Sequence, residues 1–155
     1  MSEPNIELRP RGGVGVYIVN SNNEVLLTLR SSAHATGTWC PPGGHIEYGE
    51  SFLQTAARET KEEVNMDINS IEVAGVTGDV YPSELKHYVT VHVKAGQYSG
   101  EAKIMEPHKC AEIKWFSLDS LPDKLFPATK SFLDSNPLCL CGSGKKYREC
   151  HGKNL

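Results

Sequence analysis

Three glutamates within five residues are the strongest chemical signal in this chain. Glu59, Glu62 and Glu63 stand at positions i, i+3 and i+4, so on a helix they lie along one face. Like charges stacked in this way repel one another by about a few tenths of a kcal/mol per pair. A hard divalent cation such as Mg²⁺, which prefers carboxylate oxygens, would offset that repulsion. The alternative is a solvated helix face on which Arg58 and Lys61 pair with the glutamates.

The residues before these glutamates favour the metal interpretation. Gly43 and Gly44 predict a sharp turn that brings backbone carbonyls close to a metal. The pattern predicts a helix over residues 51–64, and Glu50 can accept hydrogen bonds from its first amides. Asn65 is expected to end that helix in the left-handed conformation. Turn, helix and glutamates together form one long gapped motif.

This motif resembles the Nudix box, which has the pattern Gly, five residues, Glu, seven residues, Arg-Glu, a hydrophobic residue, any residue, Glu-Glu, any residue, Gly and a hydrophobic residue. Two positions depart from it: Thr60 is less apolar than usual, and Asn65 replaces the final glycine. Neither departure removes a ligand. The positions in register are Gly44, Glu50, Arg58, Glu59, Glu62, Glu63 and Met66.

The resemblance implies the α/β fold of the family, an α/β/α sandwich with a mixed sheet. It also implies Mg²⁺- or Mn²⁺-dependent hydrolysis of a nucleoside diphosphate linked to another group. The family's roles, carried over position by position, make Glu59 and Glu63 the main metal ligands, and Glu62 assists directly or through water. The Gly43–Gly44 backbone would offer a carbonyl ligand. Arg58 would orient the glutamates, and Glu50 would brace the loop on the helix.

Residues 11–135 as a whole are similar to the MutT-like nucleoside triphosphate diphosphatases within that family. The similarity implies a nucleoside triphosphate substrate, with a purine base that is oxidised or modified in some relatives, cut to a monophosphate and pyrophosphate. One alternative is a different nucleoside diphosphate derivative, such as a dinucleotide or a nucleotide sugar. Another is an interaction module in which the Nudix body serves only as a scaffold. The intact glutamates favour an enzyme.

Candidate substrate contacts outside the motif are less specific. Arg30 could touch a phosphate, although a surface arginine is the simpler interpretation. The general base stays open: Glu106 or Glu112 could supply a carboxylate, but both are more simply surface charges. Four aromatic residues could contact a base, although a place in the core is simpler for each: Trp39, Tyr81, His87 and Tyr88.

A second cluster of chemically active residues lies near the C-terminal end. Cys139, Cys141, Cys150 and His151 offer three thiolates and an imidazole, which can close a tetrahedral structural Zn²⁺ site and leave no position for water. Their spacing, with a Gly-Ser-Gly-Lys-Lys-Tyr core, resembles the SEC-C motif. In the SecA translocation ATPase that module contacts a chaperone, which implies a protein partner; the alternative is a structural staple without one. Hydrolysis is expected not to depend on this tail.

The remaining pattern predicts the elements that must position these residues. Strands are expected at 14–19 and 25–29, joined as a hairpin through the polar residues 21–23. Further strands are expected at residues 71–77, 86–94 and 113–117, and a second helix at 128–133. Residues 1–10 are expected to be a lead-in. The predicted division is a Nudix domain at residues 1–136 and a zinc-binding tail at 137–155.

Composition limits the function classes. The 155 residues, with 39% hydrophobic and 23% charged side chains, suit one ordinary domain with a small appendage. A net charge of -3 argues against broad nucleic-acid binding. The sequence has no long apolar run and no signal-peptide pattern, so we expect a cytoplasmic protein without membrane association. Five cysteines are an odd number that suits metal binding better than disulfides. The expected partner is a nucleotide substrate, and whether the chain forms a homodimer stays open.

Overall fold

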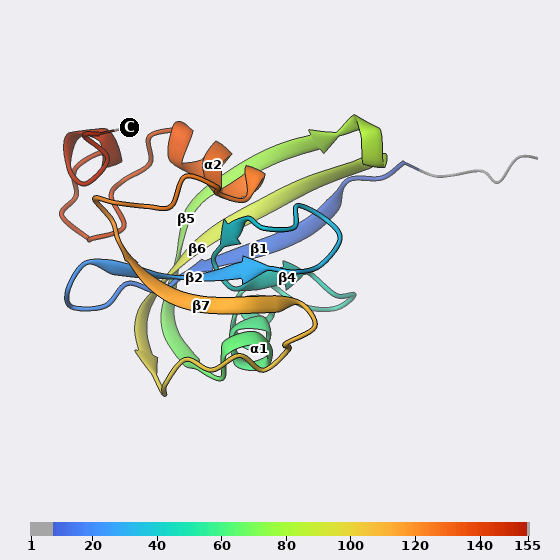
Figure 1. Ribbon diagram of the computed structural model, residues 1–155, viewed down its shortest axis with the longest axis horizontal. Coiled ribbons are helices and arrows are strands. Elements are labelled where there is room, and N and C mark those ends of the chain that lie inside the picture. The colour runs from blue at the N-terminus through green and yellow to red at the C-terminus, as the bar shows by residue number, and fades with distance from the viewer. Residues whose placement is uncertain (1–7, 155) are drawn as a thin grey trace, which may run out of the picture.

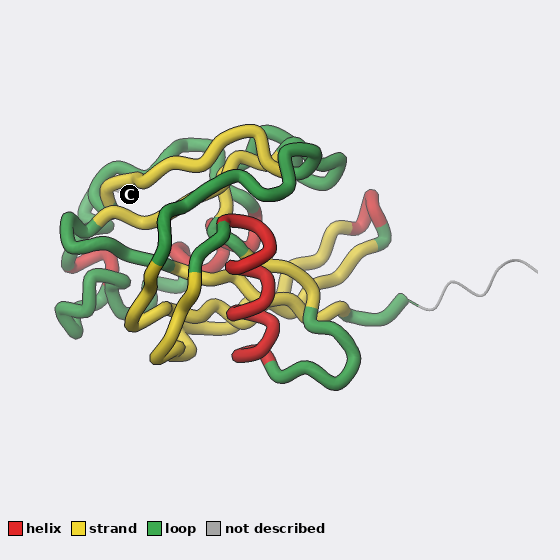
Figure 2. Tube along the Cα trace, turned by 90° about the horizontal axis from the view of Figure 1, so that it is seen from below, coloured by secondary structure: helices red, strands yellow, loops and turns green. Residues whose placement is uncertain are grey.

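The computed structural model describes residues 8–154, so most of the expected lead-in lies outside the described residues. These residues form two α-helices, two short 3₁₀ turns and seven strands (Figures 1 and 2). In chain order the elements are β1 (Arg11–Tyr17), β2 (Glu24–Arg30), β3 (Trp39–Cys40), β4 (Gly43–His45), α1 (Phe52–Val64), β5 (Asp67–Tyr81), η1 (Pro82–Glu84), β6 (Lys86–Ser99), β7 (Cys110–Ser117), α2 (Pro127–Asp134) and η2 (Tyr147–Glu149).

The strands form two sheets. The larger sheet has the order β4-β1-β6-β5, in which β1 runs parallel to β6 and the other neighbours are antiparallel. The smaller sheet, β3-β2-β7, is antiparallel throughout. Helices α1 and α2 lie on opposite sides of the strands (Figure 1). The predicted α/β class and mixed sheet are confirmed, whereas the separate second sheet was not predicted.

The predicted hairpin between the first two strands forms only beside its turn, where the Asn20 amide donates to the Glu24 carbonyl at 2.9 Å and the Leu26 amide donates to the Ile18 carbonyl at 3.0 Å. Strand β1 pairs with β4 on one side and with β6 on the other, so both of its edges are occupied. Strand β2 therefore turns away and pairs with β3 and β7 instead. A single bridge between Val19 and Val25 remains where the chain crosses from one sheet to the other.

Helix α1 carries the motif and is fixed at both ends. Ser51 is the N-cap, and its side chain and that of Gln54 form a reciprocal capping box. Glu50 therefore does not take the capping role that the sequence suggested. Asn65 ends the helix at a φ of 59°, as predicted. Thr60, the less apolar position, is fully buried. Its hydroxyl is satisfied there, because it donates to the Ala56 carbonyl at 2.7 Å. No helix in residues 8–154 is long and apolar enough to span a bilayer.

Two apolar cores lie on either side of the larger sheet. The first, around Val16 and Val93, is covered by α1 through Ala56 and Val64. The second joins α2 to the tail, and residues from both are almost fully buried: Phe132, Leu133, Cys139, Leu140 and Tyr147. The Tyr147 hydroxyl donates to the Leu118 carbonyl at 3.0 Å. The tail lies beside α2 (Figure 1) and completes this second core.

Strands β5 and β6 are much longer than the sequence predicted. They form a hairpin that begins at Asp67 and ends at Ser99, with a bulge between Val73 and Gly75. The tip of the hairpin, at η1, reaches away from the body (Figure 2). Alternating polar residues in the distal half hid this extension from the sequence pattern, yet this half forms one wall of the site.

Candidate functional site

Four carboxylates from three segments line one hollow of about 340 Å³, and the most exposed of them is Glu47, from the loop before α1. Glu59 and Glu63 reach it from α1, and the Gly43 amide donates to Glu63 Oε2 at 3.1 Å. Glu106 reaches the same hollow from the loop between β6 and β7 and is held by Lys109 Nζ at 2.9 Å. Glu62 does not line it, because its half-exposed carboxylate turns toward Arg58.

Glu106 therefore lies in the carboxylate hollow, although a surface charge was the simpler interpretation of its sequence position. The loop that carries it has no periodicity, and only its place in the fold brings it opposite α1. Glu112, the other candidate, does not line this hollow.

Burial makes the two carboxylates on α1, Glu59 and Glu63, costly to ionise. It raises the pKa of Glu63 to about 8, and the charges of Glu59 and Glu106 add to that effect. Burial also raises the pKa of Glu59. Hard oxygen donors that face one another with little water are the donor set that Mg²⁺ and Mn²⁺ prefer. The residues present therefore fit a divalent cation.

Arg58 connects the helix to the loop before it. Its Nε donates to Glu50 Oε1 at 2.6 Å, and its Nη1 donates to Glu59 at 2.9 Å and to Glu62 at 3.1 Å. The charge-assisted bond from Arg58 to Glu50, together with one from the Thr55 hydroxyl, lowers the pKa of Glu50 to about 2. The geometry suits the predicted roles: Glu50 ties the loop to the helix, and Arg58 holds Glu59 in place.

The expected sharp turn at Gly43 and Gly44 is wrong. Both residues are in the extended strand β4 and pair with Gly15 and Val14 of β1. Glycine is needed there for close approach instead. A Cβ on Gly43 would collide with the Val14 carbonyl oxygen, and one on Gly44 would collide with the Glu59 carboxylate. The glycines therefore let the helix carboxylates lie directly against strand β4.

Gly44→Ala is expected to lower hydrolytic activity by about tenfold or more, because the new methyl group pushes the Glu59 carboxylate out of the hollow. The fold should persist, since the collision is with the end of a side chain. Gly78→Ala is the matched control, because a Cβ there meets nothing within 4 Å. Assays of both variants at saturating Mg²⁺, with thermal unfolding curves, test this. Equal activity in Gly44→Ala and the unaltered protein would contradict it.

A second hollow of about 380 Å³ adjoins the first. The two share wall residues, among them Arg30, Cys40 and His45. Arg11 and Lys86 add positive charge to the larger hollow. Six aromatic rings line its walls: His34, His45, Tyr81, Tyr88, His92 and Phe126. This larger hollow, called the aromatic cavity below, offers flat apolar surfaces beside cations, an arrangement that suits a base and its phosphates.

Two of the four aromatic candidates from the sequence lie at the aromatic cavity, and two do not. Tyr81 and Tyr88 line the aromatic cavity. Trp39 packs edge-on against Phe116 at 4.8 Å in the second core, and His87 does not line the cavity.

Arg30 is half-buried rather than a free surface residue. It donates to the His34 carbonyl at 3.0 Å and to the Ser32 hydroxyl at 2.9 Å, and its guanidinium lies over the Phe126 ring. His34, His45 and Phe126 were missed because their neighbours in sequence give no periodic signal.

His92 connects this cavity to the second core. Its Nδ1 lies 3.0 Å from the Tyr17 hydroxyl and its Nε2 lies 2.9 Å from the Thr77 hydroxyl. Burial lowers the pKa of His92 to about 4, so the ring is neutral near pH 7. The ring stacks on Phe132 of α2 at 4.5 Å. The cavity wall therefore rests on the same helix that the tail covers.

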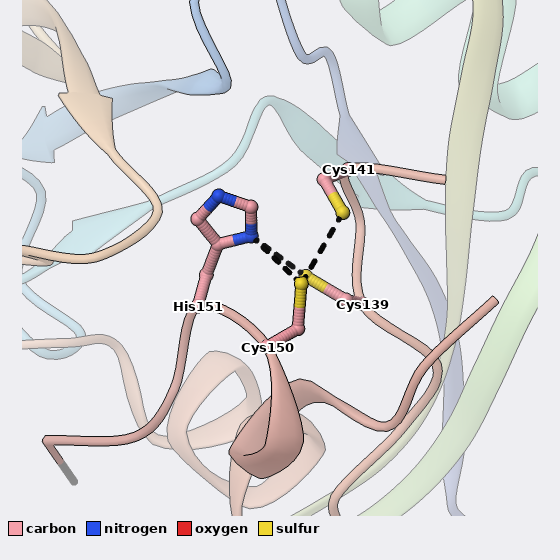
Figure 3. A group of neighbouring side chains, drawn as sticks. All are labelled: Cys139, Cys141, Cys150 and His151. Atoms are coloured by element: carbon pink, nitrogen blue, oxygen red, sulfur yellow. Dashed lines mark hydrogen bonds between the residues drawn. The ribbon is translucent and has the colours of Figure 1, made fainter. Parts of the chain in front are cut away.

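The four predicted tail ligands converge (Figure 3). Their ligand atoms all lie within 4.8 Å of one another. His151 Nδ1 is 3.3 Å from the sulfurs of Cys139 and Cys150, and Cys141 Sγ is 3.6 Å from Cys150 Sγ. A tetrahedron with Zn–S of about 2.3 Å and Zn–N of about 2.0 Å has edges of about 3.5 to 3.8 Å. The set therefore fits a closed zinc site.

Comparisons with known proteins agree with this geometry. The family model for the NUDIX domain matches residues 9–135, and the model for the SEC-C motif matches residues 136–153. A MutT NUDIX hydrolase structure from Burkholderia pseudomallei superposes with a TM-score of 0.78 at 31% identity, over 81% of this chain and 97% of that one.

Curated relatives point in the same direction. The NAD-capped RNA hydrolase NudC of Stutzerimonas stutzeri is 30% identical over 79% of this chain and 42% of its own length. The zebrafish (Danio rerio) m7GpppN-mRNA hydrolase NUDT17 is 26% identical over 83% of this chain and 47% of its own length. The chain thus spans less than half the length of these two relatives. With the family match over most of its residues, the chain belongs to the NUDIX hydrolase family and has a SEC-C motif after the NUDIX domain.

Proposed function

We propose that this protein hydrolyses the pyrophosphate bond of a dinucleotide-type substrate, in a reaction that depends on Mg²⁺ or Mn²⁺. The observation that carries the proposal is the pair of adjoining hollows, one lined by carboxylates and the other by aromatic rings and cations. A nucleotide bound across their shared wall would place its base among the rings and its phosphates beside Glu59 and Glu63.

The residues at the two hollows have different roles in the proposed reaction, according to their chemistry. Glu59, Glu63 and Glu106 would hold the divalent ion, which when bound supplies positive charge to the phosphate oxygens and acidity to a coordinated water. Arg30 and Lys86 balance the charge of the incoming anion. The Arg58–Glu50 contacts keep Glu59 positioned while the substrate binds. Water attacks one phosphorus, the bridging oxygen leaves with the other phosphate, and two monophosphates result.

The curated relatives favour a dinucleotide over a triphosphate. NudC and NUDT17 are named for substrates in which a pyrophosphate or a triphosphate bridge joins two nucleosides. The triphosphate assignment from the sequence remains the second candidate, because the MutT structure aligns with this chain over 97% of the MutT chain's own length. Both candidates use the same carboxylate hollow and differ in what lies beyond the second phosphate.

Product analysis distinguishes the two candidates. The full chain is incubated with Mg²⁺ and, separately, NAD⁺, a nucleotide sugar, ATP and dGTP, and the products are separated by ion-exchange chromatography. We expect NAD⁺ to yield two monophosphates with the highest kcat/KM of the set. Highest activity on a triphosphate, with release of pyrophosphate, would establish the second candidate instead. Absence of Mg²⁺-dependent cleavage in every reaction would contradict both.

For the tail we propose a structural Zn²⁺ bound by Cys139, Cys141, Cys150 and His151. The support is the convergence of the four ligand atoms, which all lie within 4.8 Å of one another. All five cysteines of the chain are free thiols in the structure, which suits the reducing cytoplasm that we propose as the compartment.

A further inference from the structure

Buried polar atoms without a partner gather near the aromatic cavity. Among residues 8–154, three buried side-chain atoms have no hydrogen-bond partner: His34 Nε2, the Tyr81 hydroxyl and Asp79 Oδ2. Native proteins leave few such atoms, because each one costs about 1–3 kcal/mol. His34 and Tyr81 both line the cavity, whereas Asp79 does not. The cavity wall therefore contains two buried polar atoms that no protein group satisfies and that a ligand could bond.

His34 is held in one orientation from several sides. Its Nδ1 lies 2.7 Å from Glu84 Oε2, and Lys86 Nζ lies 3.0 Å from the same carboxylate oxygen. Its ring meets Tyr81 and Phe126 edge to face, with centroids 4.9 and 5.6 Å away. The side chain is 14% exposed. A ring so fixed cannot turn its free nitrogen toward another protein group.

The Glu84 contact determines what the free nitrogen can do. A carboxylate only accepts hydrogen bonds, so Nδ1 of His34 must carry the proton. In the neutral imidazole, Nε2 then has a lone pair and acts as an acceptor. An acceptor repels phosphate oxygens but attracts an N–H group. Tyr81, whose hydroxyl can donate, stands beside it and can serve a neighbouring ring nitrogen.

We propose that His34 determines base specificity: its Nε2 accepts a hydrogen bond from an exocyclic amino group of the substrate's base, and Glu84 acts as a positioning residue. This inference rests on the proposed function for the reaction, but it concerns nucleotide binding alone. A base without the amine leaves Nε2 buried and unpaired. Because sites built to bond a polar group reject analogues that lack it, the difference appears as selectivity between otherwise identical nucleotides.

Two pairs of nucleotides that differ by one amino group test the proposal. AMP is compared with purine riboside 5′-monophosphate, and GMP with IMP, by titration calorimetry on the full chain. We expect the amino member of at least one pair to bind about tenfold more tightly, as one satisfied buried hydrogen bond provides. In His34→Phe, which keeps a ring in place, that preference should vanish. Equal binding within both pairs, or a preference unchanged in His34→Phe, would overturn the proposal.

The positioning role of Glu84 has its own test. Glu84→Ala removes the acceptor for Nδ1 and should lower the amine preference at least threefold, whereas Glu84→Gln keeps an acceptor oxygen and should restore it. Tyr98→Phe, which removes a hydroxyl outside the cavity, should match the unaltered protein. A Glu84→Ala protein with full preference would remove Glu84 from the proposal. Since binding is measured without turnover, an amine preference without pyrophosphate cleavage would contradict only the proposed function, and cleavage without the preference only this inference.

Discussion

Replacing Glu63 by glutamine is expected to lower kcat by about a hundredfold or more, as happens when a ligand of a catalytic metal is lost. The substitution keeps the shape of the side chain, and its amide oxygen can still accept from the Gly43 amide. Glutamine, however, cannot ionise and so cannot become an anionic ligand when a divalent ion binds at this buried position. The divalent ion then has fewer anionic ligands in place when the substrate arrives.

Glu72→Gln is the matched control, because Glu72 is an exposed glutamate of β5 outside both hollows. The measurements are kcat, KM and the Mg²⁺ concentration for half-maximal rate. Glu63→Gln should need more Mg²⁺ and still show a low maximal rate, while Glu72→Gln should resemble the unaltered protein. Near-normal turnover in a well-folded Glu63→Gln protein would remove Glu63 from the site.

Cys141→Ser is expected to abolish zinc binding and lower Tm by about 10 °C or more. A structural zinc site contributes its binding free energy to folding, and a loss of several kcal/mol shifts Tm by that amount in a chain of this size. Cys139 and Leu140, next to Cys141, are buried in the second core with Tyr147, so loss of the site also loosens apolar packing. Activity measured well below Tm should stay within about threefold, because the closed ligand shell has no position for water.

Lys146→Met is the matched control, since Lys146 is an exposed residue of the same tail. Elemental analysis, thermal unfolding and low-temperature assays of both variants decide the outcome. A Cys141→Ser protein with unchanged Tm would show that the tail packs without metal. If that protein remained folded but had lost its activity, the tail would shape the active site directly.

The motif-bearing half of the fold was predictable because its signals are local. The span of α1 and its stop at Asn65 depend on residues within one helix, so the sequence pattern was sufficient for both. The convergence of the tail ligands followed in the same way from short spacing.

The rest depends on contacts between distant segments, which periodicity does not register. Glu106 joins the carboxylates only because the loop between β6 and β7 runs along the end of α1, where the Met105 amide donates to the Glu63 carbonyl at 3.2 Å. Gly43 and Gly44 look like a turn, but they are needed because strand β4 lies against the Val14 backbone and the Glu59 side chain. The hairpin signalled at residues 21–23 does not extend beyond its turn for a similar reason, since β4 and β6 occupy the two edges of β1.

The shared second core also has a consequence for the order of folding during synthesis. The first core is built from residues up to about position 95, with Trp115 and a few others against it, so it can form early as the chain emerges from the ribosome. The second core must wait for Leu140 and Tyr147. Until then Phe132 and Leu133 lack part of their cover, so the nascent chain passes through a stage with exposed apolar surface. Prompt zinc capture by the tail would shorten that stage.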